Sequence, residues 1–494
     1  MTHSDPAQFD GPAVQGLLDE VLALRQAIVT EGEQLLAGFG GADTPDAAVG
    51  NLAHYLALRH HDVRPLQRQL MWRGLSSIGR LEGRVLPAID AVIGALAALG
   101  GEASPFSLPT EAEFFAGDER LGIASDLLFG PRPAGRRPRI MVTLPSEASA
   151  DPAFILDLAR RGMDIARINC AHDDPEDWQA MAGHVRAAEA TLGRRLTVLM
   201  DIAGPKIRTE AVIAPDKTRL QAGDRLRLVA EGQPRVDELV RFGAAVSLPE
   251  MVNRLSVGDR VRYDDGKLEG VVETVSGGEA VVRVTVTKTG GAKLKPEKGL
   301  NLPDTALGLS PLTSKDESDL ATVIGHADMI GYSFVSRADD IDILEAALAR
   351  HGLADKPLGL VAKIEIPEAV KNLPAMIARA AGRRPFGVMI ARGDLAAEIG
   401  FERLAEMQEE ILWICEAASV PAIWATQVLE DLVTTGIPSR GEMTDAAMAS
   451  RAECVMLNKG PAVGTAIELL DRLLARMDDH QYKKTPMLRA LKSW

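Results

Sequence analysis

Short apolar runs alternate with longer amphipathic segments from about residue 139 to the end of the chain. Apolar runs of this length, rich in Val, Ile, Leu and Met, are typical of strands buried on both faces of a parallel sheet. The segments between them predict helices, so the pattern is that of repeated β–α units. Eight runs are present: RIMVTL (139–144), DIARINC (164–170), TVLMDIA (197–203), DMIGYSF (328–334), LGLVAKIE (358–365), GVMIARGD (387–394), VPAIWATQ (420–427) and CVMLNKG (454–460). Eight such units predict an α/β fold, a closed (β/α)8 TIM barrel.

The chain before the barrel has a different pattern. Apolar residues from Val14 to Leu24 follow a 3.6-residue period, and further amphipathic segments lie near 46–60 and 80–99. Pro131, Pro133 and Pro138 then indicate a linker. We therefore expect an N-terminal α-helical domain over 1–130.

More than a hundred residues separate the third and fourth apolar runs, far more than one crossover helix needs. This stretch has alternating valines and glycine-rich turns, which predict strands. We expect a small β-barrel domain over 208–300, inserted at the rim of the barrel as a lid. The catalytic barrel then spans 138–207 and 301–480, and 481–494 form a C-terminal tail.

Polar residues stand at the ends of the apolar runs, where the active sites of such barrels lie. Lys363 and Glu365 are two residues apart on one strand and so face the same side. Glu365 and Asp394 end neighbouring strands and could reach one cation, and two carboxylates plus substrate oxygens are a usual way to hold Mg²⁺. The alternative is a surface lysine and two solvated acids that end ordinary strands.

Composition limits the possible functions. The chain has 55 basic and 69 acidic residues, a net charge of −14, which argues against nucleic-acid binding as the main role. The three cysteines, Cys170, Cys415 and Cys454, have no pair spacing that indicates a disulfide framework or a zinc site. We find no signal peptide and no apolar span of 18 residues, so we expect a cytoplasmic protein without a membrane partner. The Arg- and His-rich segment around His60 and His61 is interpreted as a solvated helix face.

An ordered set of motifs resembles the pyruvate kinase family. The motifs include ARINCAHD (166–173), MDIAGPKIRT (200–209), KGLNLPD (298–304), AKIE (362–365), VMIARGDL (388–395), ATQVLEDL (425–432) and PSRGEMTDAA (438–447). The resemblance covers roughly 138–475. It implies phosphoryl transfer from phosphoenolpyruvate to ADP, with Mg²⁺ or Mn²⁺ as the cofactor.

The resemblance also implies site residues. Glu365 and Asp394 match the divalent-metal ligands, and Lys363 matches a lysine that stabilises charge on the transferring phosphoryl group. Arg167 and Arg208 match phosphate-binding arginines, and Asn169 and His172 belong to the same loop as Arg167. Gly393, Asp394 and Thr426 match the cradle of the substrate carboxylate, with Thr426 near the proton path. Ser333 and Phe334 match a contact on the phosphate side, and Lys459 is a candidate for the nucleotide phosphates.

The sequence departs from the family pattern at several positions. Ala171 and Ile202 replace hydroxyl residues that help to hold a monovalent cation, whereas Asn169 and Asp201 remain. Lys206 replaces a glutamate of the GPEIR motif, so its ammonium group could take the place of K⁺. The alternative is that Lys206 only pairs with a nearby acid such as Asp201. Ala203 and the segment NKGPAVG (458–464) also differ from the family.

The resemblance leads to three functional hypotheses. The first is a pyruvate kinase that does not require K⁺. The second is a related phosphotransferase with a different enol phosphate or acceptor, and the third is a non-catalytic phosphoenolpyruvate sensor. Because Trp494 follows soon after the expected last barrel helix, we expect the family's C-terminal regulatory domain to be absent. A homodimer through the barrel faces is a further expectation.

Overall fold

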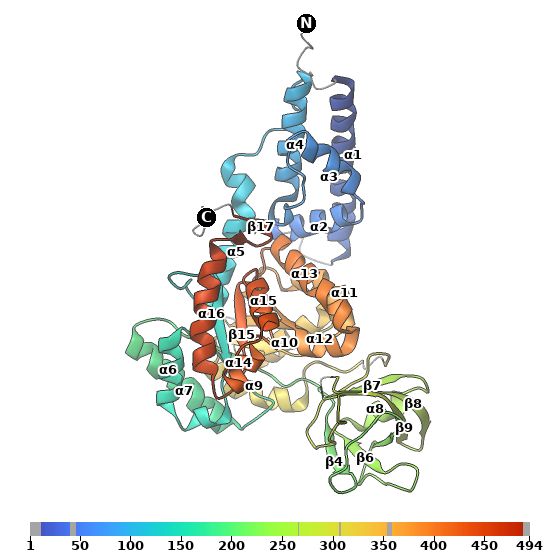
Figure 1. Cartoon of the computed structure of the whole chain (residues 1–494). Coiled ribbons are helices and arrows are strands. Elements are labelled where there is room, and N and C mark those ends of the chain that lie inside the picture. The colour runs from blue at the N-terminus through green and yellow to red at the C-terminus, as the bar shows by residue number, and fades with distance from the viewer. Residues whose placement is uncertain (1–10, 40–45, 265, 306–307, 353–357, 488–494) are drawn as a thin grey trace.

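The computed structural model describes residues 11–39, 46–264, 266–305, 308–352 and 358–487. Figure 1 shows a helical domain, a central barrel and an inserted β-domain, with the first and the last at opposite ends of the barrel. The barrel strands close in the order β1-β15-β14-β13-β12-β11-β3-β2, with all pairs parallel. Their bounds are β1 Arg139–Thr143, β2 Ile165–Asn169, β3 Thr197–Asp201, β11 Met329–Tyr332, β12 Gly359–Ile364, β13 Phe386–Ala391, β14 Ala422–Ala425 and β15 Cys454–Leu457. The predicted (β/α)8 barrel and all eight of its strands are confirmed.

Helices surround the barrel and cover the outward side chains of its strands. Local sequence signals begin several of them: Asp174 accepts a hydrogen bond from the amide of Asp177, and Thr313 forms a capping box with Asp316. The helices are α6 Pro152–Arg161, α7 Pro175–Leu192, α9 Ser314–His326, α10 Ala338–Arg350, α11 Pro367–Ala380, α12 Arg392–Ile399, α13 Phe401–Ala417, α14 Glu430–Thr435, α15 Arg440–Ala449 and α16 Val463–Asp478, with a 3-10 turn at Ser146–Ser149.

The inserted domain is a mixed sheet of seven strands in the order β10-β7-β8-β9-β5-β6-β4. Its elements are β4 Thr209–Ile213, β5 Arg225–Val229, β6 Phe242–Val246, α8 Pro249–Arg254, β7 Arg260–Tyr263, β8 Leu268–Ser276, β9 Glu279–Thr287 and β10 Leu300–Asn301. The domain has its own hydrophobic core, which includes Leu226, Phe242, Val261 and Val282. It therefore does not need the barrel core to bury its apolar face.

The N-terminal domain consists of helices, as predicted. These are α1 Gly11–Gly38, α2 Ala47–Arg59, α3 Arg64–Trp72, a 3-10 turn at Glu82–Arg84, α4 Val85–Gly100 and α5 Glu111–Phe129. The stretch Glu82–Gly100 is long and apolar enough to cross a membrane by length and composition alone, so the expectation of no such span was wrong here. In the structure Ile89 and Ile93 of this stretch are buried within the protein, and Asp90 pairs with Arg25 of α1 at 2.5 Å.

Helix α5 joins the helical domain to the barrel. Its last residues, Leu128 and Phe129, belong to the same core cluster as the inward side chains Met141, Leu199 and Met389 of the strands. Gly359 and Gly387 make room for this contact, because a Cβ atom at either position would collide with a Leu128 methyl group. Gly359 begins β12 and Gly387 is the second residue of β13, so the helical domain covers the face of the barrel opposite the carboxyl ends of the strands.

The end of the described chain forms a hairpin of β16 Gln481–Tyr482 and β17 Thr485–Pro486. Lys483 at its turn is buried and pairs with Glu453 of the barrel. Lys484 pairs with Glu82 of the helical domain. The hairpin thus links these two parts, and residues 488–494 of the predicted tail lie outside the described residues.

Candidate active site

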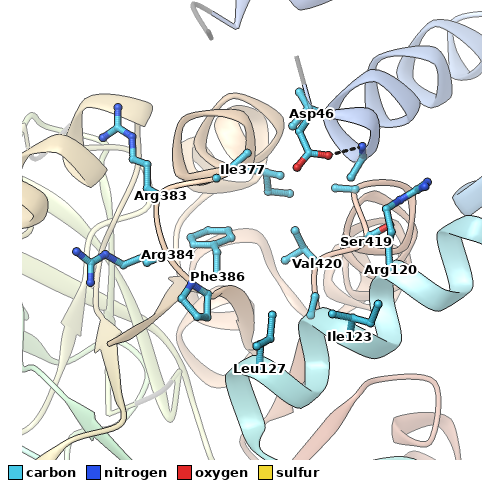
Figure 2. Close-up of a pocket in the computed structure, with 17 residues that line it drawn as sticks. Asp46, Arg120, Ile123, Leu127, Ile377, Arg383, Arg384, Phe386, Ser419 and Val420 are labelled. Atoms are coloured by element: carbon cyan, nitrogen blue, oxygen red, sulfur yellow. Dashed lines mark hydrogen bonds between the residues drawn. The ribbon is translucent and has the colours of Figure 1, made fainter. Parts of the chain in front are cut away.

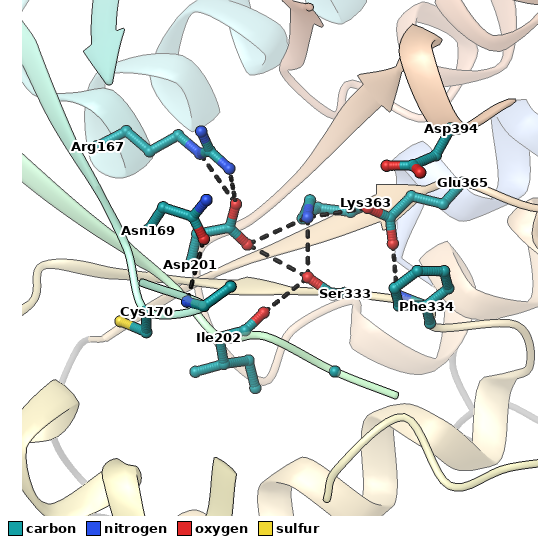
Figure 3. A network of polar contacts seen from close by, with 12 residues as sticks. Arg167, Asn169, Cys170, Asp201, Ile202, Ser333, Phe334, Lys363, Glu365 and Asp394 are labelled. Carbon is teal, nitrogen blue, oxygen red and sulfur yellow. Dashed lines mark hydrogen bonds and ion pairs between the residues drawn. The ribbon is translucent and has the colours of Figure 1, made fainter. Parts of the chain in front are cut away.

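Lys363 lies at the centre of a polar network at the carboxyl ends of the barrel strands (Figure 3). Its Nζ donates to Ser333 Oγ at 2.8 Å and lies 2.9 Å from Glu365 Oε1 and 3.3 Å from Asp201 Oδ1. Asp201 ends β3, Ser333 follows β11 and Glu365 follows β12, so the closed barrel brings together residues far apart in the sequence. Ser333 Oγ donates to the carbonyl oxygen of Ile202 at 2.7 Å, which fixes the hydroxyl beneath the ammonium group.

The charges of this network stabilise one another. Burial opposes the charged form of Lys363, but Asp201 and Glu365 outweigh it and raise the pKa of the lysine. Burial likewise opposes ionisation of Asp201, yet Lys363 and Arg167 together lower the pKa of that carboxyl. Arg167 reaches Asp201 Oδ2 with Nε at 2.9 Å and with Nη2 at 2.5 Å. The site therefore presents a fixed lysine cation, held in place before any substrate binds.

Glu365 and Asp394 lie beside each other at the same rim (Figure 3). Burial raises the pKa of Glu365, Lys363 opposes this shift, and the charge of Asp394 adds to it. Glu365 Oε2 accepts from the amide of Phe334 at 2.7 Å, which orients the carboxylate. Among the residues that the structure describes, no group of three or more His, Cys, Asp or Glu side chains could hold a metal ion. Two oxygen donors fit a hard cation that takes its remaining ligands from substrate and water.

Lys206 contacts this acidic pair. Its Nζ lies 2.6 Å from Asp394 Oδ1. Asp201 instead pairs with Arg167 and Lys363, and Asn169 Oδ1 accepts from the amide of Ala171 at 3.2 Å. Asn169 and Asp201 are register partners on β2 and β3, and no hydrogen bond or ion pair among the described residues joins Lys206 to either of them. That Lys206 replaces a monovalent cation stays a prediction.

Gly393 and Thr426 are brought together as the resemblance implies. The amide of Gly393 donates to Thr426 Oγ1 at 2.8 Å. Thr426 has a φ of 64° and Phe334 a φ of 56°, left-handed values that non-glycine residues adopt at a cost. Thr426 directly follows β14, and Phe334 lies two residues after the end of β11, so both are at the active-site rim. Strained backbone there is consistent with a site whose side chains must be held in one direction.

Three of the predicted nucleotide residues, His172, Arg208 and Lys459, form a basic group. Burial lowers the pKa of His172, and the positive charges of Lys459 and Arg208 lower it further. These three side chains are therefore close enough to interact. Arg208 donates to the carbonyl oxygen of Glu297 at 3.2 Å, and Lys459 is exposed. A basic, accessible group is suited to an anionic ligand such as a chain of phosphates.

The structure adds residues that the sequence analysis did not single out. Arg392 donates to the carbonyl oxygens of Ala425 and Thr426 at 3.0 and 2.6 Å, and forms a two-pronged ion pair with Asp445. It therefore fixes the backbone that carries Thr426. The only sequence signal was the place of Arg392 directly before Gly393 and Asp394.

Contacts between the inserted domain and α12 were also missed. Asn301 donates to Glu398 at 2.9 Å, and Arg262 donates to the carbonyl oxygen of Ala397 at 2.5 Å. Burial raises the pKa of Glu398 to about 7. Helix α12 also carries Asp394, so the inserted domain rests on the helix that bears part of the acidic pair.

Comparisons with known proteins agree with this geometry. A family model described as "Pyruvate kinase, barrel domain" matches residues 135–467. The chain is 33% identical over 367 residues to a protein named pyruvate kinase from Agrobacterium vitis, covering 72% of each chain. It is 32% identical over 350 residues to one from Methylorubrum extorquens, covering 69% of each, and 30% identical over 360 residues to one from Mycobacterium intracellulare, covering 71% of this chain and 72% of the relative. With a family match over well more than half of its length, this chain belongs to the pyruvate kinase family.

Proposed function

We propose that this protein transfers a phosphoryl group from phosphoenolpyruvate to ADP, giving pyruvate and ATP. The observation that carries the proposal is the buried ammonium group of Lys363 between Asp201 and Glu365, next to the acidic pair of Glu365 and Asp394. Phosphoryl transfer needs mainly positioning and positive charge around the moving group. The names of the similar proteins support this choice of substrates.

Lys363 acts on the charge of the transferring group. The bond from phosphorus to the enol oxygen breaks, and a bond forms to a terminal oxygen of ADP, while negative charge remains on the phosphoryl oxygens and develops on the enolate. A fixed ammonium group that needs no reorganisation stabilises such charge most effectively in a site from which water is excluded. Asp201, Glu365 and Ser333 hold that group in place.

Glu365 and Asp394 are the residues that would hold Mg²⁺ or Mn²⁺. The bound ion would supply positive charge to the phosphoryl oxygens and to the substrate carboxylate. Lys206 contacts Oδ1 of Asp394, so it would compete with the ion for the charge of this carboxylate. Glu365 keeps its orientation through the amide of Phe334.

The loops after β13 and β14 bind the rest of phosphoenolpyruvate. The amides of Gly393 and Asp394 lie at the start of α12, where amides favour a carboxylate, and the Gly393 amide would exchange Thr426 Oγ1 for the substrate. Thr426, held by Arg392, lies beside this cradle, so its hydroxyl is placed to lead a proton to the enolate carbon. That proton completes pyruvate.

The basic group of Arg208, His172 and Lys459 receives the phosphates of ADP, with Arg167 and Asn169 on the same side. An arginine pairs two N–H groups with phosphate oxygens, which fixes the nucleotide in orientation as well as in distance. The absence of a need for K⁺ forms part of the proposal, with Lys206 as the cation built into the chain.

A coupled assay that follows pyruvate formation from phosphoenolpyruvate, ADP and Mg²⁺ tests the proposal. We expect turnover in the unsubstituted protein, and Glu365→Gln and Asp394→Asn should each raise the Mg²⁺ concentration needed for half-maximal rate. Glu402→Gln, an exposed acid on α13, is the matched control. Binding of phosphoenolpyruvate without turnover would instead favour a sensor, and turnover with another acceptor but not with ADP would favour a related phosphotransferase.

A further inference from the structure

The two added domains meet the barrel in different ways. The helical domain leaves an apolar cavity beside the loops that lead into β13 and β14, with Ile377, Phe386 and Val420 in its lining (Figure 2). The inserted domain instead contacts the barrel through polar side chains at the other end of β13, where this strand continues into α12. Hydrogen bonds depend on distance and direction, so this second junction favours one position of the inserted domain.

Two residues of the inserted domain hold the last turn of α12. Arg262 of β7 donates from Nη1 to the carbonyl oxygen of Ala397 at 2.5 Å, and Asn301 of β10 donates from Nδ2 to Glu398 Oε1 at 2.9 Å. Arg262 and Asn301 are directly opposite each other in the antiparallel pair of β7 and β10, so they reach neighbouring residues of the helix. A cation near the last carbonyl groups of a helix is also favoured by the helix dipole.

Both of these side chains are largely buried. The side chain of Arg262 is 13% exposed, and its Nε lies 2.6 Å from Glu269 Oε2 of β8, which fixes the direction of the guanidinium group. Asn301 is 5% exposed, and its Oδ1 has no hydrogen-bond partner among the described residues. Glu398 is half-buried, so removing the Asn301 amide leaves a carboxyl oxygen without its partner in a poorly solvated place, which is costly.

A short path joins these contacts to the proposed nucleotide site. Leu300, the residue before Asn301, donates its amide to the carbonyl oxygen of Ile207 at 2.9 Å. Ile207 directly precedes Arg208, which contributes to the basic group from the inserted domain. The other two members of the basic group follow β2 and β15 of the barrel. The position of the inserted domain therefore determines whether Arg208 faces them.

We propose that Arg262 and Asn301 are positioning residues for the nucleotide: by holding the last turn of α12, they keep Arg208 opposite the two basic side chains of the barrel. This role rests on the proposed kinase activity, because it takes Arg208 as a ligand of ADP. The cradle for phosphoenolpyruvate does not depend on these contacts, since Arg392 fixes the backbone at Thr426 from within the barrel. Loss of the contacts should therefore weaken the binding of ADP and leave that of phosphoenolpyruvate almost unchanged.

Steady-state kinetics, with ADP and phosphoenolpyruvate varied separately, tests this role. Arg262→Met and Asn301→Ala should each raise the KM for ADP at least about tenfold, because a buried hydrogen bond is lost and a smaller fraction of the molecules presents Arg208. The KM for phosphoenolpyruvate and kcat at saturating ADP should change less than about twofold. Arg283→Met is the matched control, since this exposed arginine of β9 forms its ion pair with Glu273 within the inserted domain.

Glu398 supplies a comparison that a general loss of stability would not reproduce. Glu398→Gln keeps an acceptor for the Asn301 amide and adds a donor for Asn301 Oδ1, so the KM for ADP should stay within about twofold of that of the unsubstituted protein. Glu398→Ala removes the acceptor and should raise this KM as Asn301→Ala does. Equal KM values for ADP in Glu398→Ala and Glu398→Gln would overturn the proposed contact.

The position of the inserted domain can also be measured without catalysis. Spin labels attached to Lys288→Cys of the inserted domain and Glu402→Cys of α13 report the distance between the two parts, since both positions are exposed and the three native cysteines are buried. The distance distribution should broaden on adding Arg262→Met.

An unchanged distribution in that variant would overturn the inference, and so would equal increases in the KM values for ADP and phosphoenolpyruvate. If the unsubstituted protein does not turn over these substrates, the proposed function fails, whereas the distance distributions still decide whether Arg262 holds the inserted domain in place.

Discussion

Lys206 Nζ lies 2.6 Å from Oδ1 of Asp394, a proposed metal ligand. Lys206 belongs to the segment that leads into the inserted domain. A divalent ion that binds Glu365 and Asp394 competes with this ammonium group for the negative charge of Asp394. The same lysine is the proposed substitute for K⁺. Through its contact with Asp394, Lys206 therefore affects both the requirement for Mg²⁺ and the requirement for K⁺. Substitutions of Lys206 can separate the two.

Lys206→Met should lower the Mg²⁺ concentration needed for half-maximal rate by about three- to tenfold, because a competing charge of modest strength is removed from Asp394. The measurement is a metal titration at saturating phosphoenolpyruvate and ADP. Lys288→Met, at an exposed position of the inserted domain, is the control and should leave the titration unchanged. Identical metal titrations for Lys206→Met and the unsubstituted protein would contradict competition at Asp394.

The rate in buffer without K⁺ should equal the rate with it. A lysine ammonium and K⁺ carry the same charge, and two positive charges a few ångströms apart in a poorly solvated site repel by several kcal/mol, about 4 at an effective dielectric constant of 20. The site should therefore hold either the ammonium group of Lys206 or K⁺, but not both. Lys206→Glu should lose activity without K⁺, and added K⁺ should restore only part of it because Ala171 has no hydroxyl. A rate that rises steeply with K⁺ in the unsubstituted protein would refute the substitution.

Lys363→Met should reduce kcat by about 10²- to 10³-fold or more, since a preorganised charge at the developing negative charge is lost. The KM for phosphoenolpyruvate should change little if the ammonium group acts mainly in the transition state. Loss of the lysine also leaves Asp201 and Glu365 without a partner, so the melting temperature of each variant has to be measured. Lys363→Arg keeps the positive charge, so it separates the loss of transition-state stabilisation from the loss of stability. If a folded Lys363→Met changes only KM, Lys363 does not have the proposed role.

The barrel could be predicted from the sequence because its strands are buried on both faces, which makes each one a continuous apolar run. Lys363, Glu365 and Asp394 could be predicted to lie at one edge because they end such runs. The Lys206–Asp394 contact could not, since the two residues are 188 positions apart and meet only when the inserted domain is placed on the barrel. The role of Leu128 and Phe129 was equally hidden, because they end helix α5, whose sequence shows little amphipathic pattern. Gly359 and Gly387 leave the space that Leu128 occupies, but nothing in the sequence distinguishes them from other glycines in strands.

Arg392→Lys should lower kcat by about tenfold or more while leaving the fold intact. Lysine keeps one charge but cannot bond the carbonyl oxygens of Ala425 and Thr426 and both oxygens of Asp445 together, as the arginine fork does. The left-handed backbone at Thr426 should then relax and misplace its hydroxyl, and small misplacements of catalytic groups are costly. The diagnostic measurement is proton exchange at C3 of pyruvate, which should fall together with kcat. Arg403→Lys, on the surface of α13, should alter neither.

The pH dependence of stability should contain a contribution from Glu416. This carboxyl of α13 is 8% exposed, and burial raises its pKa to about 7, with Lys483 opposing the shift and Glu82 and Glu453 adding to it. In the unfolded chain its pKa is near the ordinary value of about 4.3. Between these two values the unfolded chain has lost the proton that the folded chain still holds. The free energy of unfolding therefore falls as the pH rises from about 4 to about 7, and the contribution is constant above that window.

Glu416→Gln removes the titrating group but keeps a side chain of similar size that can donate and accept hydrogen bonds. Its free energy of unfolding relative to that of the unsubstituted protein should thus rise by about 1 kcal/mol or more between pH 5 and pH 8, since one pKa unit corresponds to about 1.4 kcal/mol. Urea unfolding at several pH values measures this difference, and Glu402→Gln on the exposed surface of the same helix should show no such trend. A constant difference between Glu416→Gln and the unsubstituted protein across this range would show that Glu416 titrates alike in both states. A difference that falls with pH would mean that Lys483, rather than burial, dominates the carboxyl.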